Sequence, residues 1–374
     1  MTIRRIRLVR LTLGYSGGLV LHTASSGAVP TLSEIRLLVE QDGELIALGS
    51  TRSNIAYLSG LPAETVEAQI LAAARKLDWS APPEDLAGQL DTRFPGSPAP
   101  VRMLFEMAAA DASARAKGLP LATWLGAAPA AGLAVTDTNQ TLFWQDDASL
   151  IERAEAYAAR GFLQLKLRIG ITAFDDDLRR LALLRAHLGP AARLSVDANG
   201  QWDMAAAPAR LEALARLGIE YVEQPLPAGD WEATARIAAV SPVPIMLDES
   251  LSSFAAVEQL AATRAAPLAH LKLAKLGGLD RMMAAGRCLS AAGIGVMIGQ
   301  MNEGVVSTLA AAHAALALGA SLRELYGADH LTGDPATPAP RYSDGLLHLP
   351  GGPGLGLVGH PIPSNETPLW DKTL

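Results

Sequence analysis

Three carboxylates and one lysine recur at nearly even intervals along the middle of the chain. Asp197, Glu223, Asp248 and Lys272 each close a short apolar run, and they follow one another at steps of 26, 25 and 24 residues. Such a step is about the length of one strand, one helix and two loops, so each polar residue is expected at the same end of successive parallel strands. Acidic side chains converging there would provide oxygen ligands for a hard divalent cation, with a lysine beside it.

This donor set predicts chemistry next to a carboxylate. Three carboxylates around one cation leave positions open for a substrate carboxylate, whose α-carbon proton becomes more acidic when the metal is bound. The cation then stabilises the enediolate that forms when that proton leaves. Lys272 is the natural base, and nearby positive charge is expected to lower its pKa. A lone carboxylate at a strand end is more often a helix cap or an ion-pair partner, but four polar residues in register are hard to obtain by chance.

Two basic residues belong to the same predicted site. Lys166 and Arg168 alternate on one strand, so their side chains share a face, and in a closed barrel that face can be the lumen. Two buried positive charges require compensating anions, which Asp197, Glu223 and Asp248 would supply. Lys166, Arg168 and Lys272 are therefore the candidate catalytic residues.

Other polar residues follow the same strands with weaker signals. Spacing favours Asp248 over Glu249 as the third ligand. Glu249 is expected to orient Lys272 or one of the metal ligands without binding the metal itself. Asn199 could contact metal-bound water or cap the following helix with equal plausibility. Gln300 and Glu303 follow the seventh strand, where Glu303 is expected to hydrogen-bond the substrate carboxylate as an acid, with a helix cap as the alternative.

Two residues of early loops complete the candidates for contact with the substrate or with residues behind it. His22 occurs in a Gly- and Ser-rich segment, and a surface histidine is the stronger interpretation. Tyr57 ends the segment Arg52-Ser-Asn-Ile-Ala-Tyr57, which could contact the substrate or form a structural turn.

A repeating unit accounts for the even spacing. From about residue 145 the sequence repeats an Ala-rich amphipathic helix, a glycine at its end and a β-branched or Leu-rich run, which predicts parallel strands with helical crossovers. Eight such strands would close into a (β/α)8 barrel of the modified TIM type. They are expected near residues 133–138, 163–168, 194–197, 219–223, 245–248, 268–273, 295–298 and 322–326.

The ends of the chain have a different pattern. Residues 1–125 predict an α+β capping domain, with strands near 4–13 and 34–40 and helices near 62–77 and 101–117. The first of these strands is expected at the edge of its sheet. Residues 126–330 would form the barrel, entered through a linker near 123–132. Residues 331–374 contain a predicted hairpin and are expected to return to the capping domain.

Composition restricts the partners. The net charge of -7 and the pI near 5.6 argue against nucleic acid or an anionic membrane, since both favour a basic surface. A single cysteine excludes an internal disulfide framework and fits a reducing cytoplasm. No apolar run approaches the length of a membrane span. We therefore expect a cytoplasmic enzyme that acts on a small carboxylate and forms a homo-oligomer.

Taken together, the motifs resemble those of the enolase superfamily, and most closely its muconate lactonizing enzyme subgroup. The motifs, which extend over nearly the whole chain, are Phe105-Glu-Met-Ala-Ala-Ala-Asp111, Ala116-Lys-Gly-Leu-Pro120, Val196-Asp-Ala-Asn, Val222-Glu-Gln-Pro, Leu247-Asp-Glu-Ser, Leu271-Lys-Leu-Ala-Lys-Leu-Gly-Gly and Gly352-Pro-Gly-Leu-Gly. The resemblance implies Mg²⁺, with Mn²⁺ as an alternative, on Asp197, Glu223 and Asp248. It also implies that Lys272 acts as acid and base on one face, under early loops of the capping domain near residues 15–30 and 50–60.

One departure from the family pattern affects the expected reaction. The family's second strand usually carries Lys-x-Lys, whereas this chain has Arg168 at the second position. A guanidinium is a poor proton acceptor at neutral pH, which disfavours racemisation by a pair of lysines. An isomerase, either a cycloisomerase or an epimerase, is the first expectation. A syn-dehydratase of a hydroxy acid or acid sugar is the second, and a non-catalytic metal-binding relative is the third.

Overall fold

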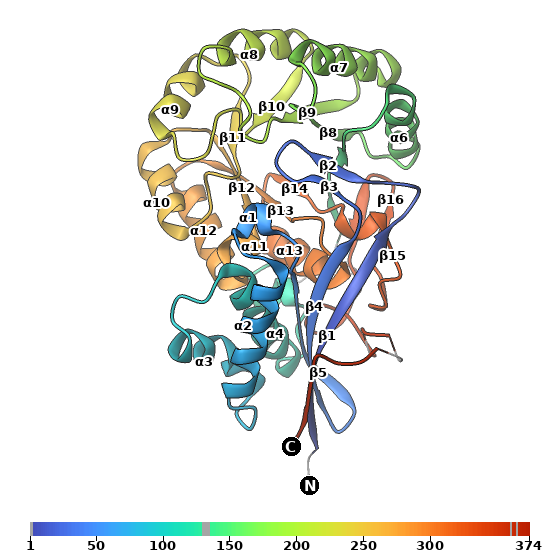
Figure 1. Cartoon of the computed structure of the whole chain (residues 1–374), viewed down its shortest axis with the longest axis vertical. Helices are drawn as coiled ribbons and strands as arrows, with labels where there is room; N and C mark the ends of the chain where they lie inside the picture. Colours follow the sequence, from blue (N-terminus) through green and yellow to red (C-terminus); the bar gives the residue numbers. More distant parts are fainter. Residues whose placement is uncertain (1–2, 129–134, 360, 364–365) are drawn as a thin grey trace.

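The computed structural model describes residues 3–128, 135–359, 361–363 and 366–374. Within these ranges, eight parallel strands follow one another around one sheet in chain order, which confirms the expected barrel (Figure 1). The backbone N–H of Asn139, directly before the first barrel strand, donates to the Arg323 carbonyl of the last strand at 3.0 Å. This hydrogen bond links the two ends of the sheet. The barrel strands are β7 Gln140–Leu142, β8 Gln164–Arg168, β9 Arg193–Asp197, β10 Ile219–Glu223, β11 Ile245–Leu247, β12 Leu268–Lys272, β13 Gly295–Gly299 and β14 Leu322–Glu324.

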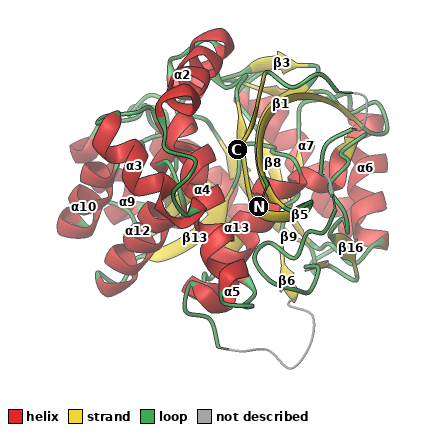
Figure 2. Cartoon of the chain, turned by 90° about the horizontal axis from the view of Figure 1, so that it is seen from below, coloured by secondary structure: helices red, strands yellow, loops and turns green. Residues whose placement is uncertain are grey.

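Helices between these strands cover the outside of the barrel. Figure 2 shows α6 and α7 on one flank and α9, α10 and α12 on the other. Their apolar residues recur at helical spacing, as in α8, where Ala207, Leu211 and Leu214 are buried. The helices are α6 Asp147–Ala159, α7 Phe174–Leu188, α8 Ala207–Arg216, α9 Trp231–Val240, α10 Phe254–Thr263, α11 Leu273–Leu276, α12 Leu279–Ala291, α13 Val305–Leu318 and the 3-10 turn η2 Gly327–His330.

The first predicted strand was placed wrongly. Residues 133 and 134 lie outside the described residues, and β6 (Val135–Asp137) pairs with β17 (Leu346–His348) rather than with a barrel strand. The strand β7 enters the barrel a few residues later and pairs with β8. The two strands are separated by only two residues, so the apolar pattern alone does not tell which of them joins the barrel. β17 also pairs with β16 (Arg341–Ser343), in the hairpin expected in this segment.

The N-terminal region forms an antiparallel sheet with helices packed beside it. Its central strand is β1 (Arg4–Tyr15), which pairs with β4 on one side and with β15 and β18 on the other. The expectation of an edge strand is therefore wrong, because the chain returns and supplies β18 from its C-terminal end. The remaining elements are β4 Leu32–Gln41, β5 Glu44–Arg52, β15 Leu331–Thr332, β18 Trp370–Thr373, α2 Ala63–Lys76, η1 Pro83–Asp85, α3 Leu86–Arg93, α4 Ala99–Ala116 and α5 Leu121–Trp124. The domain limits at residues 125 and 330 remain a prediction.

Helix α4 connects the capping sheet to the barrel. Most of its residues are buried, and Glu106 accepts hydrogen bonds from the backbone N–H groups of Leu279 (2.6 Å) and Asp280 (3.0 Å), at the start of α12. Arg102 donates to both Asp91 and Asp280. These charged contacts satisfy the free N–H groups of α12 and fix the cap against the barrel.

Two short elements of the cap reach across the barrel mouth. They are the hairpin of β2 (Leu21–Thr23) and β3 (Gly27–Val29), and helix α1 (Ala56–Ser59), which follows β5 (Figure 1). No helix in the described part of the chain is long and apolar enough to cross a membrane.

The contact between β5 and α4 yields a stability prediction. A Cβ atom at Gly49 would overlap the Leu104 carbonyl oxygen of α4, whereas a Cβ atom at Gly88 in α3 would meet nothing within 4 Å. We expect Gly49→Ala to lower the free energy of unfolding by about 1–3 kcal/mol, since sheet and helix must separate. Gly88→Ala is the matched control and should raise it by up to about 1 kcal/mol. Urea denaturation measures both, and equal stability of the two variants would contradict the prediction.

Candidate active site

The strand register brings the predicted polar residues to one end of the barrel. Arg168 is opposite Asp197 in the β8–β9 pair, and Asp197 is opposite Glu223 in the β9–β10 pair. Lys272 is likewise opposite Gly299, which is opposite Glu324 of β14. All of these ionisable groups end their strands, so their side chains meet at the carboxyl end of the barrel, where active sites of this architecture lie.

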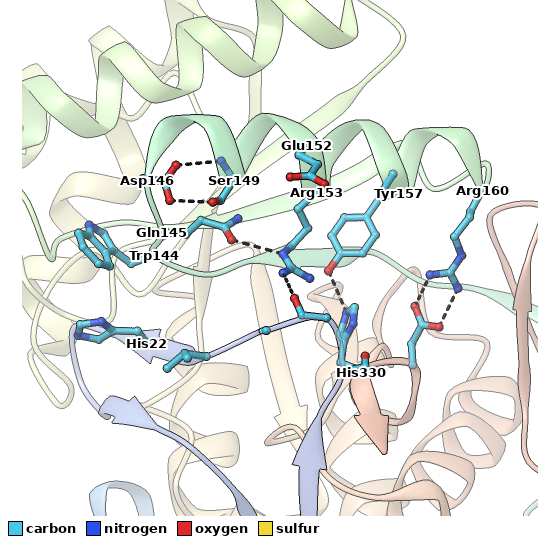
Figure 3. A pocket seen from close by; sticks show the side chains of 16 residues that line it. His22, Trp144, Gln145, Asp146, Ser149, Glu152, Arg153, Tyr157, Arg160 and His330 are labelled. Carbon is cyan, nitrogen blue, oxygen red and sulfur yellow. Dashed lines mark hydrogen bonds and ion pairs between the residues drawn. The ribbon is translucent and has the colours of Figure 1, made fainter. Parts of the chain in front are cut away.

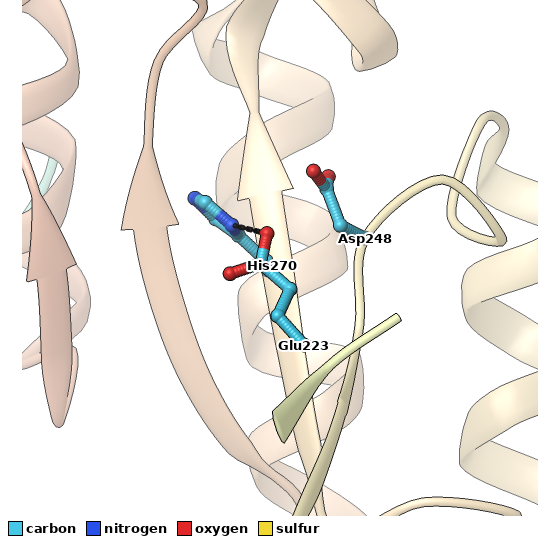
Figure 4. Close-up of side chains that lie close together, drawn as sticks. All are labelled: Glu223, Asp248 and His270. Atoms are coloured by element: carbon cyan, nitrogen blue, oxygen red, sulfur yellow. Dashed lines mark hydrogen bonds and ion pairs between the residues drawn. The ribbon is translucent and has the colours of Figure 1, made fainter. Parts of the chain in front are cut away.

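A compact group of metal-ligand atoms lies in this end of the lumen. Atoms of Glu223, Asp248 and His270 all come within 4.8 Å of one another (Figure 4). His270 Nδ1 and Glu223 Oε1 form a hydrogen bond of 2.9 Å. Asp197 belongs to the same end but its Oδ2 forms an ion pair with Arg168 NH1. The structure thus brings two of the three predicted ligands into one group and turns the third towards the guanidinium.

The carboxylates of this group are held in the charged form. Burial raises the pKa of Glu223, but Lys166 and His270 outweigh it, and the pKa lies well below its ordinary value. Burial likewise opposes ionisation of Asp248, but Lys272 and Lys275 lower its pKa. Two anionic carboxylates and an imidazole are suitable donors for a divalent cation, so the residues present fit such an ion.

The basic residues of β8 are neutralised by carboxylates of β9, β10 and β14. Lys166 Nζ donates to Glu223 Oε2 at 2.7 Å and forms an ion pair with Glu324. Arg168 lies between Asp197 and Glu324, whose Oε1 is 3.4 Å from NH2. Burial lowers the pKa of Lys166, but Glu223 and Glu324 raise it above the ordinary value overall. Burial lowers the pKa of Arg168, but Glu324, Tyr326, Glu223 and Asp248 together raise it above the ordinary value.

Two lysines share the carboxylate of Asp248. Lys272 Nζ is 2.5 Å from Oδ2, and Lys275 Nζ contacts Oδ1 and donates to the Asp248 carbonyl at 2.6 Å. Burial lowers the pKa of Lys272, but Asp248, Glu223 and Glu324 together raise it above its ordinary value. The prediction of a lowered pKa for Lys272 is wrong, because Asp248 contacts the ammonium directly. Lys275 has a lowered pKa, since burial dominates there.

A small cavity of about 50 Å³ lies at this end of the barrel. Most of the predicted site residues line it, namely Arg168, Asp248, Lys272, Asn199, Glu249, Gln300 and Tyr57. Lys166, Asp197, Glu223 and Glu303 are buried and do not line it. The β2–β3 hairpin forms part of its roof through Leu21, Thr23 and Val29.

Several polar atoms around the cavity have no hydrogen-bond partner among the described residues. They include Asn199 Oδ1, Glu249 Oε2, Gln300 Oε1 and Asn302 Oδ1. Asn199 Nδ2 also donates to Glu249 Oε1 at 3.0 Å, so these two residues form one unit. Buried acceptors are costly without partners, which indicates that the cavity accommodates a polar ligand or a cation.

His22 lies on the outer side of the hairpin. It lines a larger hollow of about 780 Å³ between the hairpin and α6, where its ring packs edge-on against Trp144 at 5.5 Å between centroids (Figure 3). Because alternate residues of a strand face opposite sides, Leu21 and Thr23 face the cavity and His22 faces away. The structure therefore separates His22 from the other predicted site residues.

Three buried charged or polar residues at the site were not predicted from the sequence. Glu324 ends the observed strand β14, but the predicted strand extended to residue 326, so the rule that site residues end their strands did not point to it. His270 precedes Lys272 by two residues and shares its face of β12. Lys275 does not lie on a strand but in the short helix α11, so the spacing of strand ends could not identify it.

Comparison with known proteins identifies the class. A model of the enolase C-terminal domain-like family matches residues 149–360. Muconate cycloisomerase 1 of Pseudomonas putida is 34% identical over 304 residues, which cover 80% of this chain and 76% of that protein. L-Ala-D/L-Glu epimerase of Bacillus subtilis is 32% identical over 269 residues, covering 70% and 71%. A solved substrate-liganded complex of the Bacillus subtilis epimerase has a TM-score of 0.86 at 26% identity and covers 96% of this chain and 99% of that one.

The chain belongs to the enolase superfamily. Within it, the muconate lactonizing enzyme subgroup inferred from the motifs is confirmed, and the chain is an enzyme of isomerase or lyase type. Membership implies a divalent metal ion, which the acidic group fits.

The choice of third ligand can be tested by metal binding. We expect Asp248→Asn to weaken Mn²⁺ binding by more than about 100-fold, because a ligand to the ion is lost. Glu249→Gln should weaken it by about 10-fold, as is usual for a residue that contacts the ligands but not the ion. Electron paramagnetic resonance of free Mn²⁺ measures both affinities. A larger loss in Glu249→Gln would assign the ligand to Glu249 instead.

Proposed function

We propose that this chain is a Mg²⁺-dependent cycloisomerase that removes the proton α to the carboxylate of a small acid, with Lys272 as the proton-transfer residue. Its superfamily membership, the acidic group at the barrel end and the position of Lys272 on the cavity wall support this assignment. The proposed ligands are Asp197, Glu223 and Asp248. When bound, the cation would make the α-proton more acidic and stabilise negative charge on the substrate carboxylate.

The observation that carries the proposal is the environment of Arg168. Its guanidinium is paired with Asp197 and Glu324, is 6% exposed, and has a pKa raised from an already high value. A group in this state donates hydrogen bonds and provides positive charge but does not accept a proton. Lys272 lines the same cavity, and Asp248 raises the pKa of its amine. An amine nevertheless has a much lower ordinary pKa than a guanidinium, so we assign the proton transfer to Lys272, on one face of the substrate.

The other cavity residues have supporting roles in this scheme. Arg168 would stabilise negative charge that develops on the substrate, from the side opposite to Lys272. Asn199 and Glu249, joined by their hydrogen bond, orient polar groups at the cavity edge. Residues of the hairpin and of α1 line the cavity and would shield a bound substrate from solvent, which would strengthen these electrostatic interactions.

Single-face chemistry also permits syn elimination of water, which is the second candidate. Epimerisation, the activity in the name of the Bacillus subtilis relative, requires proton transfer on both faces, and Arg168 opposes it. Product analysis separates the two single-face reactions, since cycloisomerisation conserves mass and dehydration removes water.

We further infer that the chain is cytoplasmic and forms a homo-oligomer. The single cysteine and the acidic net charge support this proposal, and cell fractionation and analytical sedimentation test it.

Isotope exchange tests the assignment of the base. In D₂O with Mg²⁺, over a panel of acid sugars, amino-acid derivatives and lactones, we expect α-proton exchange by the wild type. Lys272→Ala should reduce the rate by about 10²–10⁴-fold, the usual contribution of a general base. Arg168→Met should slow turnover but retain exchange, because it removes charge rather than the base.

The matched control is Arg168→Lys, which restores a titratable amine on the second face. Inversion at the α-carbon should appear in this variant and not in the wild type. No exchange with any member of the panel would favour a non-catalytic metal-binding relative, and retention of exchange in Lys272→Ala would assign the base elsewhere.

Glu303 gives a prediction for pH dependence. Burial raises the pKa of Glu303 to about 7, its Oε2 accepts from the Met301 N–H at 3.0 Å, and its Oε1 has no partner within the described part of the chain. Below this pKa the acid form can donate to the substrate carboxylate. We expect kcat/KM to fall as the pH rises through about 7, and Glu303→Gln, which keeps a donor, should remove that limb. An unchanged profile in the variant would exclude this role.

A further inference from the structure

His270 is a buried group beside Glu223 that the proposed reaction does not use. It is 0% exposed and lies on β12 two residues before Lys272, whose face of the strand it shares. Its Nδ1 is 2.9 Å from Glu223 Oε1, and its Nε2 has no hydrogen-bond partner among the described residues. Figure 4 shows Nδ1 facing the Glu223 carboxylate and the other ring nitrogen pointing away from Asp248. The ring therefore presents one nitrogen to the carboxylates of the site.

Neighbouring backbone holds the imidazole in this position. A Cβ atom at Gly299 of β13 would overlap Nε2 of His270, so the ring fits only because that position is a glycine. Lys275 Nζ donates to the His270 carbonyl at 3.0 Å, which ties this point of β12 to helix α11. The imidazole is thus placed by the fold against the carboxylates and is not a freely rotating side chain.

Asp197 is less available to an ion than the spacing of strand ends suggests. Its Oδ1 accepts from the Asn199 N–H at 2.8 Å, and its Oδ2 forms the ion pair with Arg168. The compact group of ligand atoms within the described residues accordingly contains His270 and not Asp197. An ion between the two carboxylates of that group would have an imidazole nitrogen within reach, whereas it would share Asp197 with a guanidinium.

The distance between His270 and Glu223 suits a shared ion. Adjacent ligand atoms on an ion with bonds of about 2.1 Å lie about 3.0 Å apart, close to the 2.9 Å between Nδ1 and Oε1. The ion would replace the hydrogen bond between these atoms, and the ring would keep its single proton on Nε2. An imidazole nitrogen favours transition-metal ions, whereas carboxylate oxygens also suit Mg²⁺.

We propose that His270 is a nitrogen ligand of the divalent ion, added to the proposed carboxylate ligands, and that it shifts the preference of the site from Mg²⁺ towards ions such as Co²⁺. This inference rests on the proposed function for the presence of an ion at this end of the barrel, but not for the reaction. Arg168 takes a share of the charge of Asp197, and His270 compensates with a donor that an all-oxygen site lacks.

Pulsed electron paramagnetic resonance of the Mn²⁺-loaded protein tests the assignment without a substrate, because it detects nitrogen bound to the ion. We expect ¹⁴N modulation in the wild type, and ¹⁵N modulation in its place when histidine alone carries ¹⁵N, which excludes lysine and backbone nitrogen. His270→Ala should lose the signal. The matched control is His187→Ala, because His187 lies exposed on α7 beside Glu155, and this variant should keep the signal. The labelled wild type gives an answer even if His270→Ala does not fold.

Calorimetric titration with Mg²⁺ and Co²⁺ separates a ligand from a residue that only positions Glu223. We expect His270→Ala to lower the ratio of Co²⁺ to Mg²⁺ affinity by about 10-fold or more, because the nitrogen donor contributes chiefly to Co²⁺ binding. His270→Asn keeps a hydrogen-bond donor for Glu223 but has no imidazole, so its ratio should fall as well.

Four results would overturn the assignment. They are the absence of histidine nitrogen modulation in the wild type, its survival in His270→Ala, an unchanged affinity ratio in that variant, and recovery of the wild-type ratio by His270→Asn. The proposed reaction is tested separately: if the wild type exchanges no α-proton but shows histidine nitrogen on the ion, the reaction is refuted and His270 remains a ligand.

Discussion

Charge neutralisation inside the barrel is the constraint on which the rest of this structure depends. Lys166, Arg168 and Lys272 are almost completely buried, and each contacts at least one carboxylate from a strand other than its own. Removing one partner would leave an isolated buried charge, which costs about 3–5 kcal/mol. The same pairing lowers the pKa of Glu223 and Asp248, so the fold keeps these carboxylates ionised before any cation arrives.

The two parts of the chain contribute different groups to the cavity at the barrel mouth. The barrel supplies its floor, where strand register fixes the ionisable residues relative to one another. The cap supplies its roof, through the β2–β3 hairpin, Arg52 and Tyr57. Helix α4 connects them, since Glu106 and Arg102 bind the start of α12. A shift of the cap would therefore move the roof without altering the floor, which allows selectivity and chemistry to change separately.

Much of this arrangement could be predicted from sequence because one pattern repeats along the barrel. From β8 to β14 a helix and an apolar strand alternate, a polar residue at or just after the strand end marks the site, and a glycine follows the helix before β8, β9, β10, β13 and β14. The rule fails where the repeat begins, at β6 and β7, and where a partner comes from far along the chain, as β18 does for β1. His270 and Lys275 were missed because their roles depend on contacts to Glu223 and Asp248 that spacing along the chain does not encode.

Arg168, which stands where the family usually has a lysine, bears on the metal site as well as on the proposed proton transfer. The guanidinium pairs with Asp197, so a cation that used this carboxylate would share it with a permanent positive charge. Glu324 compensates from β14, because it accepts from Arg168 and pairs with Lys166. The arginine thus has a second carboxylate partner on β14, two strands away, and the same carboxylate raises the pKa of Lys166 together with Glu223. Arg168 therefore couples β8, β9 and β14, and under the proposed function this pairing would restrict proton transfer to the face of Lys272.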